Sequence, residues 1–160
     1  MSVYLLDTNA LIYYYEGDSL GRTIETLLGV PSNRFYVTNL ALVEMRSALA
    51  KRVRGTALSL EGYQVVMRRF LRDTSSVGRF LIHPLRQRFV DPCIRLLEEY
   101  ALLKGFGLHT LDSLHLLTAL DLQLREPDLR LITADGALAN VADLAGVPAL
   151  FLELRHQAGG

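Results

Sequence analysis

The stretch that most constrains the fold is an apolar run near the N-terminus that ends abruptly in a carboxylate. No polar residue interrupts Val3-Tyr4-Leu5-Leu6, and Asp7-Thr8-Asn9 follows at once. An unbroken apolar run of this length predicts a strand that is buried on both faces, as in a parallel sheet. Asp7 then lies at the carboxyl end of the strand, where open α/β sheets place their ligands. Because a buried carboxylate is costly, we expect Asp7 to serve a function.

Strand-like and helix-like segments alternate along the rest of the chain and are joined by short links. This alternation predicts a three-layer α/β/α fold with a mostly parallel central sheet of about five strands. The expected helix N-caps are Thr8 or Asn9, Thr38 or Asn39, and Thr110. We expect strands over residues 3–6, 35–37, 80–82, 129–133 and 149–152, and helices over about 9–16, 20–28, 40–54, 60–74, 89–104 and 111–124, with a short one ending near 144.

Length and composition indicate one globular domain over residues 1–155, followed by a short flexible tail at 156–160. No apolar run reaches the roughly 18 residues that a membrane span needs. The N-terminus enters a strand directly, so we expect no secretory signal. A single cysteine, Cys93, excludes an internal disulfide and favours a reducing, cytoplasmic environment.

Charge is balanced overall but is distributed unevenly. The stretch from Arg46 to Arg95 holds eleven Lys or Arg residues against three acids, whereas the rest holds six against fourteen. A basic middle region of this kind can bind a polyanion locally, or it can consist of ordinary solvated helix faces. Lys51, Arg52, Arg54 and the arginines near 68–72 fit an RNA backbone or an acidic protein partner equally well.

Three later acidic residues occupy positions comparable to that of Asp7. Glu44 lies one to two turns into the helix after the second strand, Asp112 lies in the first turn of its helix, and Asp135 follows the fourth strand. Two strand ends and two helix N-terminal regions can face one crevice. Carboxylates gathered there repel one another, and a bound Mg²⁺ or Mn²⁺ relieves the repulsion. We therefore predict that the four acids hold a divalent metal for phosphodiester hydrolysis.

Each acid also fits a simpler role. An Asp beside a helix start is usually an N-cap, and Glu44 alone is an ordinary helix-face residue. The spacing by itself does not exclude a receiver domain or a haloacid-dehalogenase-type phosphatase. Such a phosphatase typically has a second Asp two residues after the first, where this chain has Asn9. The acidic pair and the phospho-accepting Asp that are usual in a receiver domain are also missing.

Four short motifs, one around each acid, follow one another along nearly the whole chain. They read Leu5-Leu6-Asp7-Thr8-Asn9, Leu42-Val43-Glu44-Met45-Arg46, Leu111-Asp112-Ser113-Leu114-His115-Leu116-Leu117-Thr118-Ala119 and Leu131-Ile132-Thr133-Ala134-Asp135. In this order they resemble the PIN-domain family, in particular the VapC-type toxin ribonucleases of prokaryotic toxin–antitoxin pairs. The sequence departs from that pattern in a longer middle, residues 55–85, and in Leu138 at a position where the family often has an aromatic residue.

The resemblance implies a metal-dependent endoribonuclease that cleaves single-stranded RNA and leaves a 3′-hydroxyl and a 5′-phosphate. It implies that Asp7, Glu44, Asp112 and Asp135 are the metal-site acids, with Asn9 and Thr133 as supporting polar residues. It also implies an antitoxin partner and a homodimer. Two rivals remain open, namely a housekeeping PIN nuclease of RNA processing or decay without an antitoxin, and a catalytically idle binding module.

Two further features have an open assignment. His115 shares a helix face with Asp112, so it either contacts a phosphate or packs near the pocket mouth. Tyr13-Tyr14-Tyr15 covers more than one face of its helix, which suits a protein interface better than base stacking.

Overall fold

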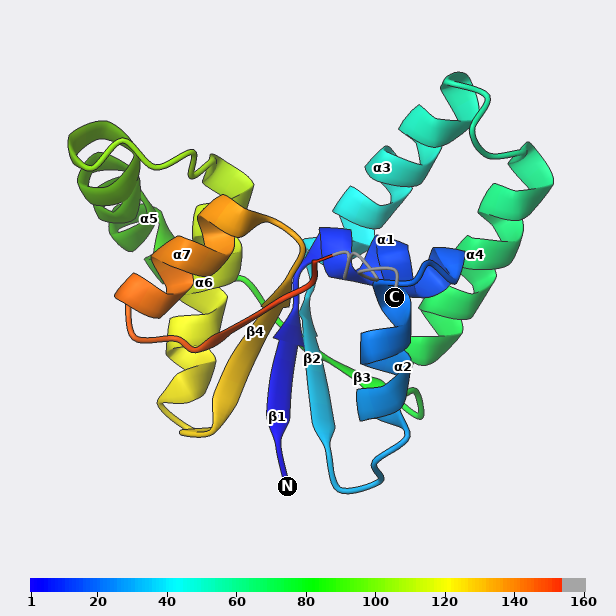
Figure 1. The fold of residues 1–160 in the computed structure, drawn as a ribbon, viewed down its shortest axis with the longest axis horizontal. Coiled ribbons are helices and arrows are strands. Elements are labelled where there is room, and N and C mark those ends of the chain that lie inside the picture. Colours follow the sequence, from blue (N-terminus) through cyan, green and yellow to red (C-terminus); the bar gives the residue numbers. More distant parts are fainter. Residues whose placement is uncertain (154–160) are drawn as a thin grey trace, which may run out of the picture.

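The computed structural model describes residues 1–153 and shows a five-stranded sheet between two layers of helices (Figure 1). The strand order is β3-β2-β1-β4-β5, and every neighbouring pair is parallel. The predicted three-layer α/β/α fold is therefore confirmed. The strands are β1 Val3–Leu6, β2 Arg34–Thr38, β3 Phe80–His83, β4 Leu129–Thr133 and β5 Ala149–Phe151.

The central strand β1 is buried along its whole length, as its apolar sequence predicts. Its side chains alternate between two cores: Tyr4 and Leu6 pack on one face of the sheet, while Val3 and Leu5 pack on the other. Covering both faces requires helices on both sides, because successive side chains of a strand point in opposite directions. The burial of both faces of β1 is consistent with its place in the middle of the sheet.

The helices divide between the two faces of the sheet by their place in the chain. The N-terminal helices α1 to α4 cover one face, and α5 to α7 cover the other (Figure 1). Helices α3 and α4 form a hairpin that extends beyond the carboxyl edge of the sheet. The bounds are α1 Thr8–Glu16, α2 Gly21–Leu28, α3 Ala41–Arg54, α4 Leu60–Asp73, α5 Val90–Leu96, α6 Thr110–Gln123 and α7 Gly136–Leu144.

All three predicted helix N-caps are wrong in detail. The N-cap of α3 is Leu40, although the Thr38 hydroxyl accepts from the backbone N–H of Ala41 at 3.1 Å. The N-cap of α1 is Asp7, not Thr8 or Asn9, and its carboxylate accepts a hydrogen bond from the backbone N–H of Ala10. The N-cap of α6 is His109, and Thr110 is the first helical residue. Asp and Thr are both common N-cap residues, so sequence preference does not choose between Asp7 and Thr8, and histidine is not a preferred type, so the sequence did not indicate His109.

The single helix expected over residues 89–104 is also wrong in detail. A 3₁₀ turn, Gln87–Phe89, precedes α5, and a π-helix, Leu97–Leu103, follows it. Pro92 lies in the first turn of α5, where its missing N–H costs no helical hydrogen bond. The apolar pattern alone does not separate α- from π-helical winding.

Residues 154–160 lie outside the described part of the chain, and so does the tail expected at 156–160. The single-domain boundary at residue 155 stays a prediction. Within residues 1–153, no helix combines the length and the apolar character needed to cross a membrane.

A buried hydrogen bond joins α1 to the end of α4. The hydroxyl of Tyr15 donates to Asp73 Oδ2 at 2.9 Å, and both side chains are buried. Of the three consecutive tyrosines, Tyr15 therefore belongs to the core, whereas Tyr13 and Tyr14 are partly exposed. Burial, followed by the charge of Asp73, raises the pKa of Tyr15, so its hydroxyl remains a donor.

We expect Tyr15→Phe to lower the free energy of unfolding by roughly 1.5–3 kcal/mol, because it leaves a buried carboxylate without its hydroxyl donor. Urea unfolding followed by circular dichroism measures this loss. Tyr13→Phe is the matched control, since no hydrogen bond of the Tyr13 hydroxyl occurs among the described residues. Equal stability of the two variants would contradict a stabilising role for the Tyr15–Asp73 bond.

Candidate functional site

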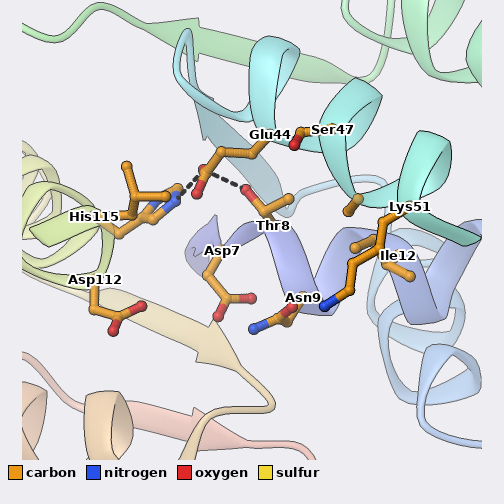
Figure 2. A pocket seen from close by; sticks show the side chains of 11 residues that line it. Asp7, Thr8, Asn9, Ile12, Glu44, Ser47, Lys51, Asp112 and His115 are labelled. Atoms are coloured by element: carbon orange, nitrogen blue, oxygen red, sulfur yellow. Dashed lines mark hydrogen bonds and ion pairs between the residues drawn. The ribbon is translucent and has the colours of Figure 1, made fainter. Parts of the chain in front are cut away.

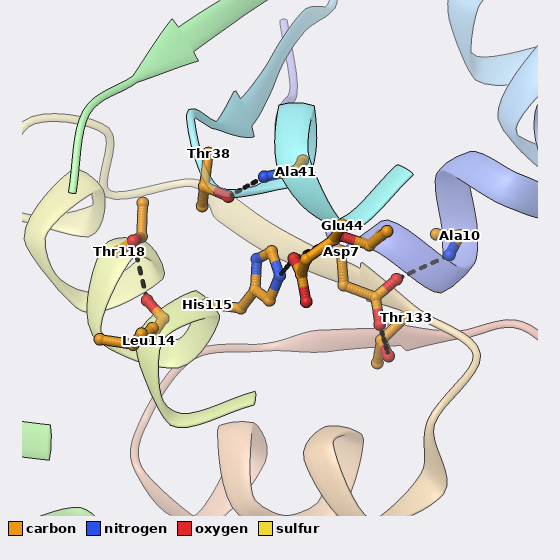
Figure 3. Close-up of polar contacts among 10 residues, drawn as sticks. Asp7, Ala10, Thr38, Ala41, Glu44, Leu114, His115, Thr118 and Thr133 are labelled. Carbon is orange, nitrogen blue, oxygen red and sulfur yellow. Dashed lines mark hydrogen bonds and ion pairs between the residues drawn. The ribbon is translucent and has the colours of Figure 1, made fainter. Parts of the chain in front are cut away.

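The register of the two central strands brings Asp7 and Thr133 together. Leu6 pairs with Ile132, so Asp7, which directly follows β1, lies beside Thr133, the last residue of β4, at the carboxyl edge of the sheet. The Thr133 hydroxyl donates to Asp7 Oδ2 at 2.6 Å, and the backbone N–H of Ala10 donates to Oδ1 at 2.7 Å (Figure 3). Asp7 is only 3% exposed. Its carboxylate is therefore held in one orientation by both oxygens.

Glu44 on α3 is held by residues from two other helices. The Thr8 hydroxyl donates to Glu44 Oε2 at 2.6 Å, and Nε2 of His115 lies 2.8 Å from the same oxygen (Figure 2). His115 is buried, with 2% of its surface exposed, and its Nδ1 has no hydrogen-bond partner among the described residues. His115 thus contacts an acid of the site, and the resemblance alone did not assign it this place.

Asp112 and Asp135 lie at the N-termini of two helices. Asp112 Oδ2 accepts from the backbone N–H of His109 at 3.0 Å. Asp135 caps α7 by accepting from Leu138 N–H at 3.0 Å. The N-cap role weighed for such acids is therefore real for Asp135, whereas Asp112 supports the start of α6 from its first turn, behind the N-cap His109.

A single pocket gathers three of the four predicted acids. Asp7, Glu44 and Asp112 line it, whereas Asp135 does not (Figure 2). Thr133, predicted as a supporting residue, touches Asp7 and also accepts from the backbone N–H of Asp135 at 2.9 Å. The other pocket-lining residues are Thr8, Asn9, Ile12, Ser47, Ala48, Lys51, Leu111 and His115.

Thr8, Ser47 and Lys51 are pocket residues that the motif comparison did not single out. Ser47 and Lys51 follow Glu44 by three and seven residues, which is the spacing of one helix face. That spacing is visible in the sequence and shows that the three residues share a helix face. Whether this face lines the pocket is known only once the direction of Glu44 is known.

The geometry agrees with a family comparison. The sequence model of the PIN domain matches residues 4–144. The chain belongs to the PIN-domain family. No curated protein matches the sequence. Members of the family are generally nucleases, and these nucleases generally use divalent metal ions.

Solved structures show the same fold at low sequence identity. The chain is similar to VapBC2 from Rickettsia felis, with a TM-score of 0.65, 17% identity and coverage of 94% of this chain and 99% of that chain. It is similar to PAE2754 from Pyrobaculum aerophilum, with a TM-score of 0.57, 19% identity and coverage of 92% and 89%. FitAcB from Neisseria gonorrhoeae gives a TM-score of 0.56, 21% identity and coverage of 92% and 96%.

The pocket of this PIN domain is electrostatically unfavourable for the ionised forms of Asp7 and Asp112 but not for that of Glu44. Burial raises the pKa of Asp7 to about 6, against the lowering effect of the Thr133 and Ala10 hydrogen bonds. Burial also raises the pKa of Asp112, and the nearby charge of Asp135 adds to the effect. For Glu44, burial acts in the same direction, but the hydrogen bonds and charge of His115 together with the Thr8 hydroxyl hold its pKa below the usual value.

The donor set suits a hard cation that keeps most of its water. Within residues 1–153, no three His, Cys, Asp or Glu side chains are grouped closely enough to enclose a metal ion. Mg²⁺, however, is usually bound by one or two carboxylates and several waters. Asp7 and Asp112 provide two carboxylates whose charges repel each other, and a cation between them would relieve that repulsion. The residues therefore fit such an ion, whereas the predicted four-carboxylate cage is not present.

Asp7→Asn tests the electrostatic cost of the buried carboxylate in metal-free protein. The wild-type carboxyl has a pKa of about 6 in the fold and near 3.8 when unfolded. A raised acid pKa means that the fold prefers the protonated form, so wild-type stability falls as pH rises from about 4 to about 6 and stays low above that. The free energy of unfolding of Asp7→Asn, relative to that of the wild type, should therefore increase by up to about 3 kcal/mol from pH 3.5 to pH 7.5.

Urea unfolding in EDTA at the two pH values measures this gain. Asp128→Asn is the control, because it removes an exposed carboxylate outside the pocket and should differ from wild type by a nearly constant amount. A gain for Asp7→Asn no larger than that of the control would show that burial of Asp7 has no such cost.

Proposed function

We propose that this PIN domain is a metal-dependent endoribonuclease that cleaves single-stranded RNA and acts as the toxin of a type II toxin–antitoxin system. The observation that carries the proposal is the pocket at the carboxyl edge of the sheet, which Asp7, Glu44 and Asp112 line. The charges of Asp7 and Asp112 repel each other, and this repulsion favours a divalent cation over a neutral ligand. The family assignment supports a nuclease as the activity that uses it.

The contacts of each side chain suggest its role. Asp7 and Asp112 would hold the Mg²⁺ or Mn²⁺, since their charges repel each other when it is absent. That cation would lower the pKa of water and stabilise the charge that develops on the phosphodiester. Thr133 would keep Asp7 in the ligating orientation. Asn9 lines the pocket and would offer a further polar group to the substrate. Asp135 would act indirectly, since its charge raises the pKa of Asp112.

Glu44 would handle the proton of the attacking water. Its Oε2 is occupied by Thr8 and His115, while Oε1 makes no hydrogen bond within the described residues. Oε1 is therefore the atom that would orient the water and accept its proton. As water attacks phosphorus, the bond from phosphorus to the 3′-oxygen would break, and the departing oxygen would take a proton from solvent. The products are a 3′-hydroxyl and a 5′-phosphate.

The proposed partners are an antitoxin protein and a second copy of the chain, with the cytoplasm as the compartment. Similar folds occur in structures described as VapBC2 bound to a DNA fragment from their promoter and as FitAB bound to the IR36 DNA fragment. Those descriptions name two-component complexes, which supports the expectation of an antitoxin here. An antitoxin would inhibit by placing a basic or bulky side chain in the acidic pocket.

We expect metal-stripped protein to cleave a mixed-sequence single-stranded RNA only after Mn²⁺ or Mg²⁺ is added. Asp7→Asn and Asp112→Asn should each lower the rate by more than the roughly 10- to 100-fold typical of residues that only orient ligands. Asp128→Asn, purified in the same way, should keep wild-type activity. The rate is measured by gel separation of end-labelled RNA.

Each outcome of the cleavage assay has a defined meaning. Activity that persists in Asp7→Asn at the wild-type level would indicate a contaminating nuclease. Protein that neither binds metal nor cleaves any RNA tested would favour a binding module, and the proposed ribonuclease would then be wrong.

Metal binding can be measured without cleavage. Saturating Mn²⁺ should raise the melting temperature of the wild type by roughly 5 °C, because the ion binds only the folded state. The increase should shrink in Asp7→Asn and in Asp112→Asn and should stay unchanged in Asp128→Asn. No increase in the wild type would contradict the proposed metal site.

A further inference from the structure

The acids of the pocket and the phosphates of the proposed RNA substrate are both negatively charged. A phosphodiester anion must approach three carboxylates, Asp7, Glu44 and Asp112, and at most part of their charge is neutralised by one divalent cation. The RNA backbone on either side of the cleaved bond carries further negative charges. A cationic side chain at the pocket is therefore needed to hold the neighbouring phosphates.

Lys51 is the only lysine or arginine that lines the pocket in the described part of the chain. It lies two helical turns after Glu44 on the same face of α3, and Figure 2 shows its ammonium group extending to the side of the pocket where Asn9 lies. No carboxylate within residues 1–153 forms an ion pair with it. Its neighbour in sequence, Arg52, is instead paired with Glu16.

The arrangement along α3 suggests a path for the substrate. Glu44, Ser47 and Lys51 line the pocket from three successive turns, so the lining changes from acidic to hydroxyl to cationic along one helix. One turn of helix rises about 5.4 Å, so Lys51 lies roughly 10 Å along the axis from Glu44. A lysine on its flexible stem can therefore meet a phosphate next to the one at the acids.

We propose that Lys51 is a substrate-binding residue that holds the phosphate adjacent to the cleaved one. This rests on the proposed ribonuclease function and adds to it the direction of the RNA, which runs from the acids along α3 toward its C-terminus. The ammonium group binds as a point charge and reads no base. Its contribution is to affinity and to the position of the backbone.

Lys51 could also act only on the stability of α3, and the experiments must distinguish that role from RNA binding. Lys51 lies in the last turn of α3, where a cation stabilises the negative end of the helix dipole. A variant that loses only that effect would melt earlier and bind RNA normally. Thermal melting of every variant by circular dichroism distinguishes the two roles.

The first test is RNA binding in EDTA, measured by fluorescence anisotropy of a labelled single-stranded oligouridylate. Lys51→Gln should raise the Kd roughly threefold to tenfold. It should also reduce the slope of log Kd against log salt by about 0.7, the value for one phosphate contact on a single strand. Lys51→Arg should restore most of the affinity, since it keeps the charge.

The control for this test is Arg46→Gln, which removes the same charge from the same helix. Arg46 is exposed, does not line the pocket, and donates to the backbone oxygen of Leu42 at 2.7 Å. It should change the Kd much less than Lys51→Gln does. Equal effects of the two variants would show that only net charge matters, and the proposal would be overturned.

The second test locates the contact on the substrate. The phosphates on either side of a mapped cleavage site are replaced, one at a time, by a neutral methylphosphonate, and kcat/KM is measured with Mn²⁺. At one of these positions the replacement should lower kcat/KM in the wild type and in Arg46→Gln, but should have no further effect in Lys51→Gln. Additive losses at every position would overturn the proposal.

The ribonuclease function and the role of Lys51 would be contradicted by different results. Wild-type protein that neither binds nor cleaves single-stranded RNA would overturn the proposed ribonuclease function, and the role of Lys51 with it. Wild-type protein that cleaves RNA while Lys51→Gln matches Arg46→Gln would leave the ribonuclease intact and overturn only the role of Lys51.

Discussion

The structure depends most on one buried carboxylate at the end of its central strand. Asp7 is nearly inaccessible to solvent, yet both of its oxygens accept a hydrogen bond, one from the start of α1 and one from Thr133 on β4. Through those two hydrogen bonds, the Asp7 carboxylate links the first strand, the first helix and the fourth strand. They reduce the cost of burial but do not remove it, since the pKa of Asp7 still rises to about 6. A cation in the pocket would relieve what remains.

The other acids of the pocket are positioned by contacts that run between helices rather than along them. Glu44 on α3 meets Thr8 on α1 and His115 on α6, so one carboxylate joins both helical layers above the edge of the sheet. Asp112 is oriented by its own helix start. A change in the packing of α6 would therefore move Asp112 and His115 together, and Glu44 would follow.

Local sequence patterns predicted much of this arrangement. The unbroken apolar run of β1 required cover on both faces, and that requirement led to the three-layer fold. The four acids were placed at strand ends and helix starts by the same reasoning. The pattern did not choose between Asp7 and Thr8 as N-cap and did not indicate His109, nor did it detect the π-helix after α5. Those features depend on hydrogen-bond geometry that similar residues satisfy equally well.

The sequence by itself determined the fold class and, through its match to the family model, the membership of the PIN-domain family; it also predicted four acids, of which three line the pocket. These follow from periodicity and from short motifs, because each depends on residues that are close together in the chain. Only the tertiary structure decided which acids share a pocket. It placed Asp135 outside the lining, bound His115 to Glu44 across 71 residues and added Lys51 from the far turns of α3. The physical reason is that strand register and helix packing set these contacts, and both act between segments that are distant in the sequence.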